Sequence, residues 1–252
     1  MKLTLIIAIF LFCLFFFTKA FGETEITTED GIEVFQNDKF YLLKKNVKIQ
    51  SDNFNLNADN VKVNFDKSLH DIIELNAEGS VNFYSKEFEM RGKGEFLKFE
   101  VKIEKLKVEG KGSELISKDI EMFSDGYIEV NNLSGNFSLN GFNSRLINEN
   151  IFIEAKSIDG NFSDISDNKE VTMLKIYDEK ISYIKNNDTE MYAKKINYNK
   201  DTSIIELIDD VIIIRNEEKI TGDYGTLDTT NNSYKINSNN QGKVKVIIQN
   251  NE

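Results

Sequence analysis

The side chains that most often catalyse reactions or bind metals are nearly absent from this chain of 252 residues. It contains one histidine, His70, and one cysteine, Cys13. His70 lies in the polar stretch DKSLHD at residues 66–71, between two runs of alternating apolar residues. A Ser-His-Asp triad would depend on this one histidine, and the sequence has no G-x-S-x-G elbow. A zinc site needs several Cys or His ligands. We therefore expect neither a catalytic triad nor a metal site.

Carboxylates are the remaining candidates for catalytic groups, because the chain has 42 acidic residues. Two of them suffice for a glycosidase, but tryptophan, a common sugar-stacking residue, is absent. Asp223 and Asp228 read either as a carboxylate pair or as turn residues that accept hydrogen bonds from their own backbone, and the second reading is favoured. No glycine-rich phosphate loop is present, so we expect no cofactor and no enzyme. Glycan hydrolysis by two carboxylates stays open as the enzymatic alternative.

The net charge of the chain argues against nucleic acid as a partner. The formal net charge is −11 and the pI is about 4.8. A nucleic-acid-binding protein normally carries a basic stripe, and none stands out here, so that class is excluded. Hydrophobic residues make up 40% of the chain, with 19 Phe and 9 Tyr, which is enough for a sizeable core.

The N-terminus has the pattern of an export signal. A short positive start is followed by an apolar run at residues 3–17, and then by the small residues Ala20 and Gly22 at the positions of an A-x-A-like cleavage site. The run is shorter than the roughly 20 residues that span a bilayer. Residues 1–22 are therefore predicted to be a signal peptide cleaved near Gly22, with an uncleaved anchor as the alternative. Cleavage would remove Cys13, so the exported chain would fold without disulfides.

The rest of the chain reads as one strand after another. Apolar and polar residues alternate with period two, which is the signature of half-buried strands, and turn-forming pairs such as Asp125-Gly126 separate the runs. No long stretch has helical periodicity. The alternating apolar positions include Val47 and Ile49, Phe54 and Leu56, Val81 and Phe83, Phe137 and Leu139, and Val211 and Ile213. The predicted class is all-β, as a sandwich, a jelly roll or a solenoid.

Four glycines, Gly79, Gly92, Gly222 and Gly225, fall where strands start or end. We expect bulges or turns with positive φ at these positions, because only glycine adopts that conformation without a steric cost.

Three segments of the sequence share a pattern of strand and turn residues that resembles the repeat of a known protein family. Residues 207–236 read LIDDVIIIRNEEKITGDYGTLDTTNNSYKI, in which DDV stands where Gly-Asn-Val is usual, ITGD follows and a later Asp matches. A second copy covers residues 41–66, with KNVKI and LNAD, and a third, partial copy has AEGSV and MRGKG within residues 77–94. These segments resemble the OstA-like repeat of the LptA family of periplasmic lipopolysaccharide transport proteins. Residues 109–201 fit only in their strand rhythm.

The resemblance implies an antiparallel, twisted β-jelly-roll whose apolar interior forms a slot for acyl chains, with a β-solenoid as the alternative fold. Val47, Ile49, Phe54, Phe83, Phe88, Phe96, Phe137, Val211 and Ile213 are the candidate lining. Packing in a dry core is the competing reading for each of them. Lys44, Lys45, Lys48 and Arg215 could meet lipid phosphates at the rim, although ordinary solvated side chains are favoured there.

The family also joins homologous folds head to tail by pairing edge strands. The C-terminal run with Val244, Val246 and Ile248 looks like such an edge, and residues 32–40 would be its N-terminal counterpart.

The implied function is a periplasmic protein that shields lipopolysaccharide acyl chains and bridges inner- and outer-membrane export components. Lipopolysaccharide, homologous jelly-roll proteins and further copies of this chain are the implied partners. The expected organisation is one elongated domain at residues 23–252, with repeat sets near 23–110 and 200–250 and a divergent middle. Two alternatives are an LptC-like subunit that keeps residues 3–17 as its membrane tether, and an exported structural solenoid that carries no lipid.

Overall fold

A computed structural model describes residues 24–118, 120–148, 151–165, 168–216, 218–231, 233–238 and 242–248. The predicted signal peptide lies outside the described residues. The described chain is almost entirely strand, with one 3-10 turn, η2 (Val101–Ile103). The expected all-β class is thereby confirmed.

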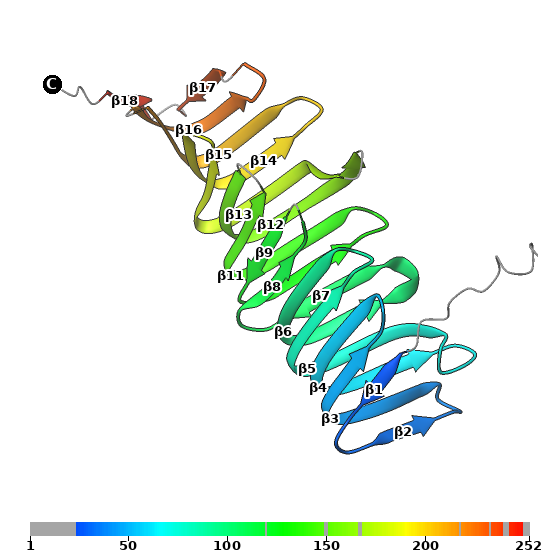
Figure 1. Cartoon of the computed structure of the whole chain (residues 1–252). Coiled ribbons are helices and arrows are strands. Elements are labelled where there is room, and N and C mark those ends of the chain that lie inside the picture. The colour runs from blue at the N-terminus through cyan, green and yellow to red at the C-terminus, as the bar shows by residue number, and fades with distance from the viewer. Residues whose placement is uncertain are drawn as a thin grey trace, which may run out of the picture.

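The strands form one 18-stranded sheet in which hydrogen-bonded neighbours are antiparallel. Figure 1 shows the strands stacked in chain order along the molecule, from β2 at one end to β18 at the other. This antiparallel order agrees with the twisted jelly-roll and excludes a parallel β-helix. The strands are β1 (Glu25–Thr27), β2 (Ile32–Phe35), β3 (Phe40–Gln50), β4 (Phe54–Phe65), β5 (Ile72–Ser85), β6 (Met90–Glu100), β7 (Lys105–Glu109), β8 (Ser113–Ile116), β9 (Glu121–Ser124), β10 (Tyr127–Asn131), β11 (Asn136–Asn148), β12 (Ile151–Ile165), β13 (Asn168–Asn186), β14 (Thr189–Asn199), β15 (Ile204–Arg215), β16 (Glu218–Asp228), β17 (Ser233–Asn237) and β18 (Lys245–Ile248).

The sheet is folded along its length into two layers, which we call leaf A and leaf B. Long strands cross from one leaf to the other, and short strands belong to one leaf only. β6 pairs with β7 through residues 96–100 and with β8 through residues 91–93. β11 pairs in the same way with β10 and β9. Leaf A therefore contains β2, β7, β10 and β17, leaf B contains β1, β8, β9 and β18, and each remaining strand contributes one segment to each leaf.

The fold line between the leaves, here called the bend, is marked by a register shift that recurs at corresponding positions from strand to strand. The shifts fall between Lys44/Val47, Asn57/Asn60, Glu78/Val81, Asn140/Ser144, Glu154/Ser157, Tyr177/Ser182, Tyr192/Lys195 and Ile208/Val211. Because a bulge bends its strand, aligned bulges bend the whole sheet.

Three of these shifts coincide with the repeated motif found in the sequence. In β3, β5 and β15 the two residues before the valine both have positive φ: Lys45 (66°) with Asn46 (51°), Gly79 (76°) with Ser80 (48°), and Asp209 (64°) with Asp210 (56°). Gly, Asn and Asp adopt this left-handed conformation most readily. The Gly-Asn-Val step is therefore the backbone signature of the bend.

The inner side of the bend is lined by small residues from successive strands. On leaf B these buried or partly buried positions are Val47, Ala58, Val81, Gly94, Ser113, Ser124, Ser144, Ala155, Ser182, Ala193, Val211 and Gly222. The leaves come closest together here, so larger side chains would not fit between them. In the middle of the chain serines replace valine, and their hydroxyls bond backbone carbonyls at the bend. Ser144 Oγ donates to Gly141 O at 3.0 Å, and Ser182 Oγ donates to Lys194 O at 3.3 Å.

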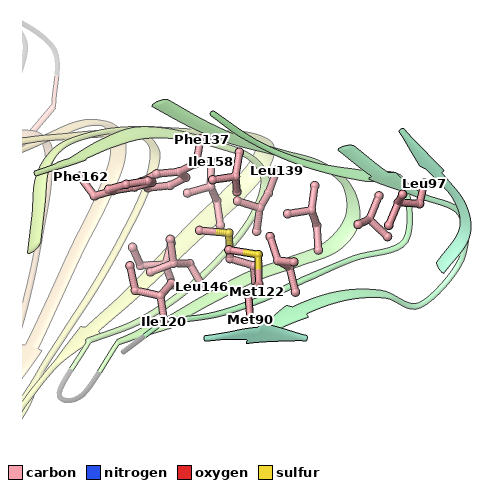
Figure 2. Close-up of a cluster of buried hydrophobic side chains, with 14 of the residues drawn as sticks. Met90, Leu97, Ile120, Met122, Phe137, Leu139, Leu146, Ile158 and Phe162 are labelled. Atoms are coloured by element: carbon pink, nitrogen blue, oxygen red, sulfur yellow. The ribbon is translucent and has the colours of Figure 1, made fainter. Parts of the chain in front are cut away.

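Away from the bend, larger apolar side chains from both leaves fill the interior. Figure 2 shows Phe137, Leu139 and Ile158 on one side of this interior, facing Leu146 and Met122 on the other. Such fully buried side chains recur from β3 to β16, so the core is a long layer between the leaves rather than a compact cluster. Burial of this apolar area is the main stabilising contribution to the fold.

Of the four glycines expected to have positive φ, only Gly79 does (76°). Gly92, Gly222 and Gly225 do not have positive φ. A Cβ on Gly92 would lie 2.5 Å from Cε1 of Phe83, and one on Gly222 would lie 2.5 Å from Cγ2 of Ile236. These two glycines are explained by close packing inside strands rather than by turn conformation.

We predict that Gly126→Ala destabilises the fold more than Gly112→Ala does. A Cβ at Gly126, on the bend, would lie 2.1 Å from the backbone oxygen of Asn140. Gly112 has a φ of 70° and open space around a Cβ, so alanine there costs only about 1–2 kcal/mol of conformational strain. The measurement is the free energy of unfolding in urea, where we expect a loss of about 3 kcal/mol or more for Gly126→Ala. Equal losses would show that the leaves do not make a tight contact at this position.

Candidate functional site

The interior between the leaves contains most of the residues expected to line a slot. Six of the nine candidates are buried there: Val47, Ile49, Phe83, Phe137, Val211 and Ile213. Phe54 and Phe88 are partly buried and pack against the same core.

Phe96 is the exception, because its side chain is 51% exposed. The register shift between Glu78 and Val81 reverses the alternation in β6, so that Gly94 faces the interior as expected but the next buried position is Leu97. Strict period-two counting continues through the bulge and therefore assigns Phe96 to the wrong face.

Two of the buried phenylalanine rings lie on glycines of the neighbouring strand. Phe83 pairs in register with Gly92, and Phe137 pairs with Gly160. A Cβ on Gly160 would lie 2.4 Å from Cζ of Phe137. The ring thus takes the space that a side chain on the paired residue would otherwise occupy, which keeps large aromatic groups inside a narrow interior.

A cavity of about 50 Å³ opens into the interior at the edge opposite the bend, where hairpin turns end both leaves. Most of its lining is apolar, and Ser85, Glu104 and Asn132 lie among the apolar groups. The remaining lining residues are Phe54, Phe83, Phe88, Met90, Leu97, Phe99, Leu106 and Val130. Nearly all of the buried apolar side chains of the described residues belong to one cluster that extends from β3 to β16.

The basic residues considered for a phosphate rim do not gather at the hairpin edge. Lys44 and Lys45 lie at the bend and form ion pairs with Glu33 (2.7 Å) and Glu29 (3.2 Å). Lys48 is exposed on leaf B, and Arg215 ends β15. The four side chains therefore do not form one basic cluster.

Both ends of the stack expose apolar edge strands. At the N-terminal end, β1 and β2 pair with β3, and Ile32 is 52% exposed. At the C-terminal end, β18 pairs with β16, and the exposed residues include Val244, Val246 and Ile248. Ile248 is 63% exposed. Unpaired, apolar edges of this kind are templates for adding another strand.

Sequence reasoning missed an aromatic cluster on the outer face of leaf B. The rings of Tyr183 and Tyr192 lie 4.9 Å apart between centroids, and Phe152 lies 5.8 Å from Tyr183. The Tyr192 hydroxyl donates to Glu190 at 3.1 Å. Burial, together with the hydrogen bond and charge of Glu190, raises the pKa of Tyr192 to about 12. No local motif reveals this cluster, because its members come from three strands that only the sheet register aligns.

Asp228 behaves as the turn residue expected from the sequence. Its carboxylate accepts hydrogen bonds from the backbone N–H of Thr230 at 2.9 Å and from Asn231 Nδ2 at 2.9 Å, and hydrogen bonds from Thr230 lower its pKa. Asp223 accepts a hydrogen bond from Ser238 Oγ at 2.8 Å. Among the described residues, no group of three or more His, Cys, Asp or Glu is arranged to hold a metal ion. No helix in the described part of the chain is long and apolar enough to cross a membrane.

Fold and site together define an antiparallel β protein with a long apolar interior and two exposed sheet edges. Residues 28–136 match the sequence model of the LptA/(LptD N-terminal domain) LPS transport protein family. This confirms, over that part of the chain, the family resemblance drawn from the repeats.

The chain aligns with the crystal structure of LptH, the LptA homologous periplasmic component of the conserved lipopolysaccharide transport device from Pseudomonas aeruginosa. The alignment covers 90% of this chain and 96% of LptH at 9% identity, with a TM-score of 0.24, and a likeness of that size carries no conclusion. No curated protein matches the chain in sequence.

We predict that the protein loses stability as the pH rises from about 10 to about 12, and that Tyr192→Phe loses less over this range. The pKa of Tyr192 is raised from 10.0 to about 12 in the folded protein. A group whose pKa is raised by folding contributes stability below its unfolded pKa and loses it as the pH rises through the folded value. The measurement is the free energy of unfolding in urea across this pH range. An identical decline in Tyr192→Phe would contradict the assignment.

Proposed function

We propose that this protein binds the acyl chains of lipopolysaccharide between its two leaves and carries the lipid across the periplasm. This proposal is based on the continuous apolar interior, which opens at the hairpin edge through a cavity lined by residues of both leaves. The match of residues 28–136 to a family of transport proteins supports this role.

The physical reason for such a carrier is the cost of exposing acyl chains to water. Each CH₂ group removed from water contributes about 0.8 kcal/mol, so a lipid with several chains does not cross an aqueous compartment unshielded. An interior built from apolar side chains on both leaves offers that shielding, while the charged outer faces remain in water. Phosphates and sugars of the lipid would stay outside the leaves.

Lipid entry on this proposal requires opening at the hairpin edge. The cavity there holds about 50 Å³, which is too small for a complete acyl chain. The bend, by contrast, is held by hydrogen bonds such as that from the Gly110 N–H to Gly126 O at 2.9 Å, and by the close approach of Gly126 to the backbone of Asn140. We infer that the leaves separate at the hairpin edge while the bend acts as the hinge line, and that guest chains replace side-chain contacts between the leaves.

We predict that Phe88→Asp strongly reduces bound lipid and that Phe142→Asp does not. Phe88 lines the cavity, whereas Phe142 is 79% exposed at the bend. A carboxylate beside an acyl chain is costly to desolvate, so lipid occupancy should fall about tenfold or more. The measurement is mass spectrometry of lipids that co-purify from an envelope containing lipopolysaccharide. Circular dichroism checks that both variants keep their β signal.

Two outcomes would overturn this proposal. A folded wild-type protein that emerges without lipid, and stays empty when lipid is added, would favour an exported structural protein. Glycan turnover that persists after lipid removal would favour the enzymatic alternative.

The exposed edges support a bridging role with homologous folds or further copies of this chain. Strands added at β1 and β2 at one end, and at β17 and β18 at the other, would continue both leaves from one molecule into the next. The apolar interior would then continue across the junction. This arrangement would link inner- and outer-membrane export components.

We predict that ending the chain before residue 243 leaves the fold intact and abolishes this association. The truncation removes β18, whose exposed apolar residues Val246 and Ile248 contribute little to the core. Size-exclusion chromatography with light scattering, over a range of protein concentrations, measures association. Loss of the β signal on truncation would show instead that β18 is needed for folding.

The N-terminal segment distinguishes two forms of the proposal. Removal of residues 1–22 would leave residues 23–252 as one elongated periplasmic domain. Retention of the apolar run at residues 3–17 would make the protein a membrane-tethered, LptC-like subunit. The mass of the protein purified from an exporting cell separates the two.

A further inference from the structure

The register of the sheet can be followed from one end of the stack to the other as rows of side chains. Residues directly opposite each other on antiparallel strands point to the same face, so each row stays either inside or outside. On leaf A, one interior row begins at Ile32 in β2 and passes through every strand of the leaf to Ile236 in β17. A second interior row begins at Val34 and ends at Tyr234. The inner face of leaf A is therefore apolar up to both of its edge strands.

Leaf B has a matching interior row between its own edge strands. It begins at Ile26 in β1 and ends at Val246 in β18. In the middle of the stack, members of the interior rows such as Ile153 are fully buried, whereas at the ends Ile26 is 39% exposed and Val246 is 52% exposed. Within the described part of the chain, no further strand covers the interior rows at either end.

The edge strands at one end are oriented to pair with those at the other end. Every pairing in the sheet is antiparallel, and an odd number of pairings separates β2 from β17 and β1 from β18. β2 and β17 therefore run in opposite directions, as do β1 and β18. Figure 1 shows β2 and β18 at opposite ends of the stack. A second copy placed end to end would thus continue the antiparallel order in both leaves.

The interior rows define one register for such a junction. If Ile236 of one copy lies opposite Ile32 of the next, Tyr234 lies opposite Val34, because the two strands advance by the same rise in opposite directions. Each interior row would then run from one molecule into the next without a polar interruption. The exposed apolar side chains at both ends would be removed from water, which is the main source of affinity in this arrangement.

The same register brings opposite charges together on the outer face of leaf A. The outer row between the two interior rows begins at Glu33 and ends at Lys235. Glu33 forms an ion pair with Lys44, and its side chain remains 53% exposed, so it has room for a second cation. Two N-terminal ends would instead bring Glu33 of both copies together, and two C-terminal ends would do the same with Lys235. An exposed ion pair adds little affinity, so this pair favours opposite ends and the correct register.

We propose that this chain assembles head to tail with itself, with β17 and β18 of one copy paired in register with β2 and β1 of the next. The inference rests on the bridging arrangement proposed above and specifies its partner. That partner is a second copy of this chain, because the two edges that complement each other belong to the same molecule. Such an interface does not close on itself, so it produces a linear filament. The paired positions are Ile236 with Ile32, Lys235 with Glu33, Tyr234 with Val34, and Val246 with Ile26.

Engineered cysteines test the register directly. The single native cysteine is replaced by Cys13→Ser, and full-length chains carrying Glu33→Cys or Lys235→Cys are mixed under mild oxidation. Directly opposite residues have Cβ atoms about 4.5–5.5 Å apart, close enough for a disulfide after a small adjustment. We expect a covalent heterodimer, identified by its mass. Ser233→Cys, two residues from the predicted partner on the same face, should cross-link to Glu33→Cys at least tenfold less.

A second set of variants tests the apolar and charged contacts by light scattering over a range of protein concentrations. Ile32→Asp should weaken association about tenfold or more, because its carboxylate would be buried at the junction. Ile103→Asp, at a residue 43% exposed in η2 and away from both ends, is the matched control and should associate like wild type. Glu33→Lys should weaken association at low salt. Adding Lys235→Glu to the same chain should restore association with itself but not with wild type.

The outcomes separate this inference from the lipid proposal. A wild-type protein that stays monomeric at every concentration, or equal cross-linking by the matched and shifted cysteine pairs, would overturn the inference. Loss of association in Ile32→Asp with unchanged lipid co-purification would support it and leave lipid carriage intact. A wild-type protein that assembles in this register but never binds lipid would overturn lipid carriage alone.

Discussion

A single sheet can bury its own apolar face only if its long strands turn at corresponding positions, and this requirement governs the rest of the structure. Near the ends of the chain the turn is made by two residues of positive φ before a valine, as at Gly79 and Ser80. In the middle it is made by wider bulges whose carbonyls bond buried serines, such as Ser144. The two solutions explain why the repeat motif is clear at both ends of the chain and fades between them.

The bend also divides the molecule chemically. Inside, small residues at the fold line and large apolar residues beyond it produce a narrow, dry layer. Outside, the same strands present lysine, glutamate and asparagine to water, and leaf B also carries the aromatic cluster of Phe152, Tyr183 and Tyr192. A strand residue and its neighbour thus lie in different environments, one in the dry interior and the other in water.

Much of the fold could be predicted from the sequence because period-two alternation is a local property. The strands and the burial of residues such as Val47, Phe83 and Ile213 follow directly from it, whereas the antiparallel arrangement was implied only by the family resemblance. The alternation fails at a bulge, which is why Phe96 lies outside. The partners of Tyr192 could not be predicted, because the cross-strand register that aligns them is set by the whole stack and not by any local segment.

The order of pairing has a consequence for how this protein varies and folds. Each strand bonds to its neighbours in the stack, and nearly all of these partners are close in sequence. Stability in such a linear array is approximately a sum of local units and the interfaces between them. Folding of such an array can begin at one hairpin and extend to its neighbours. Chain length then becomes an adjustable property: inserting or deleting one hairpin lengthens or shortens the molecule by a fixed step without redesigning its core.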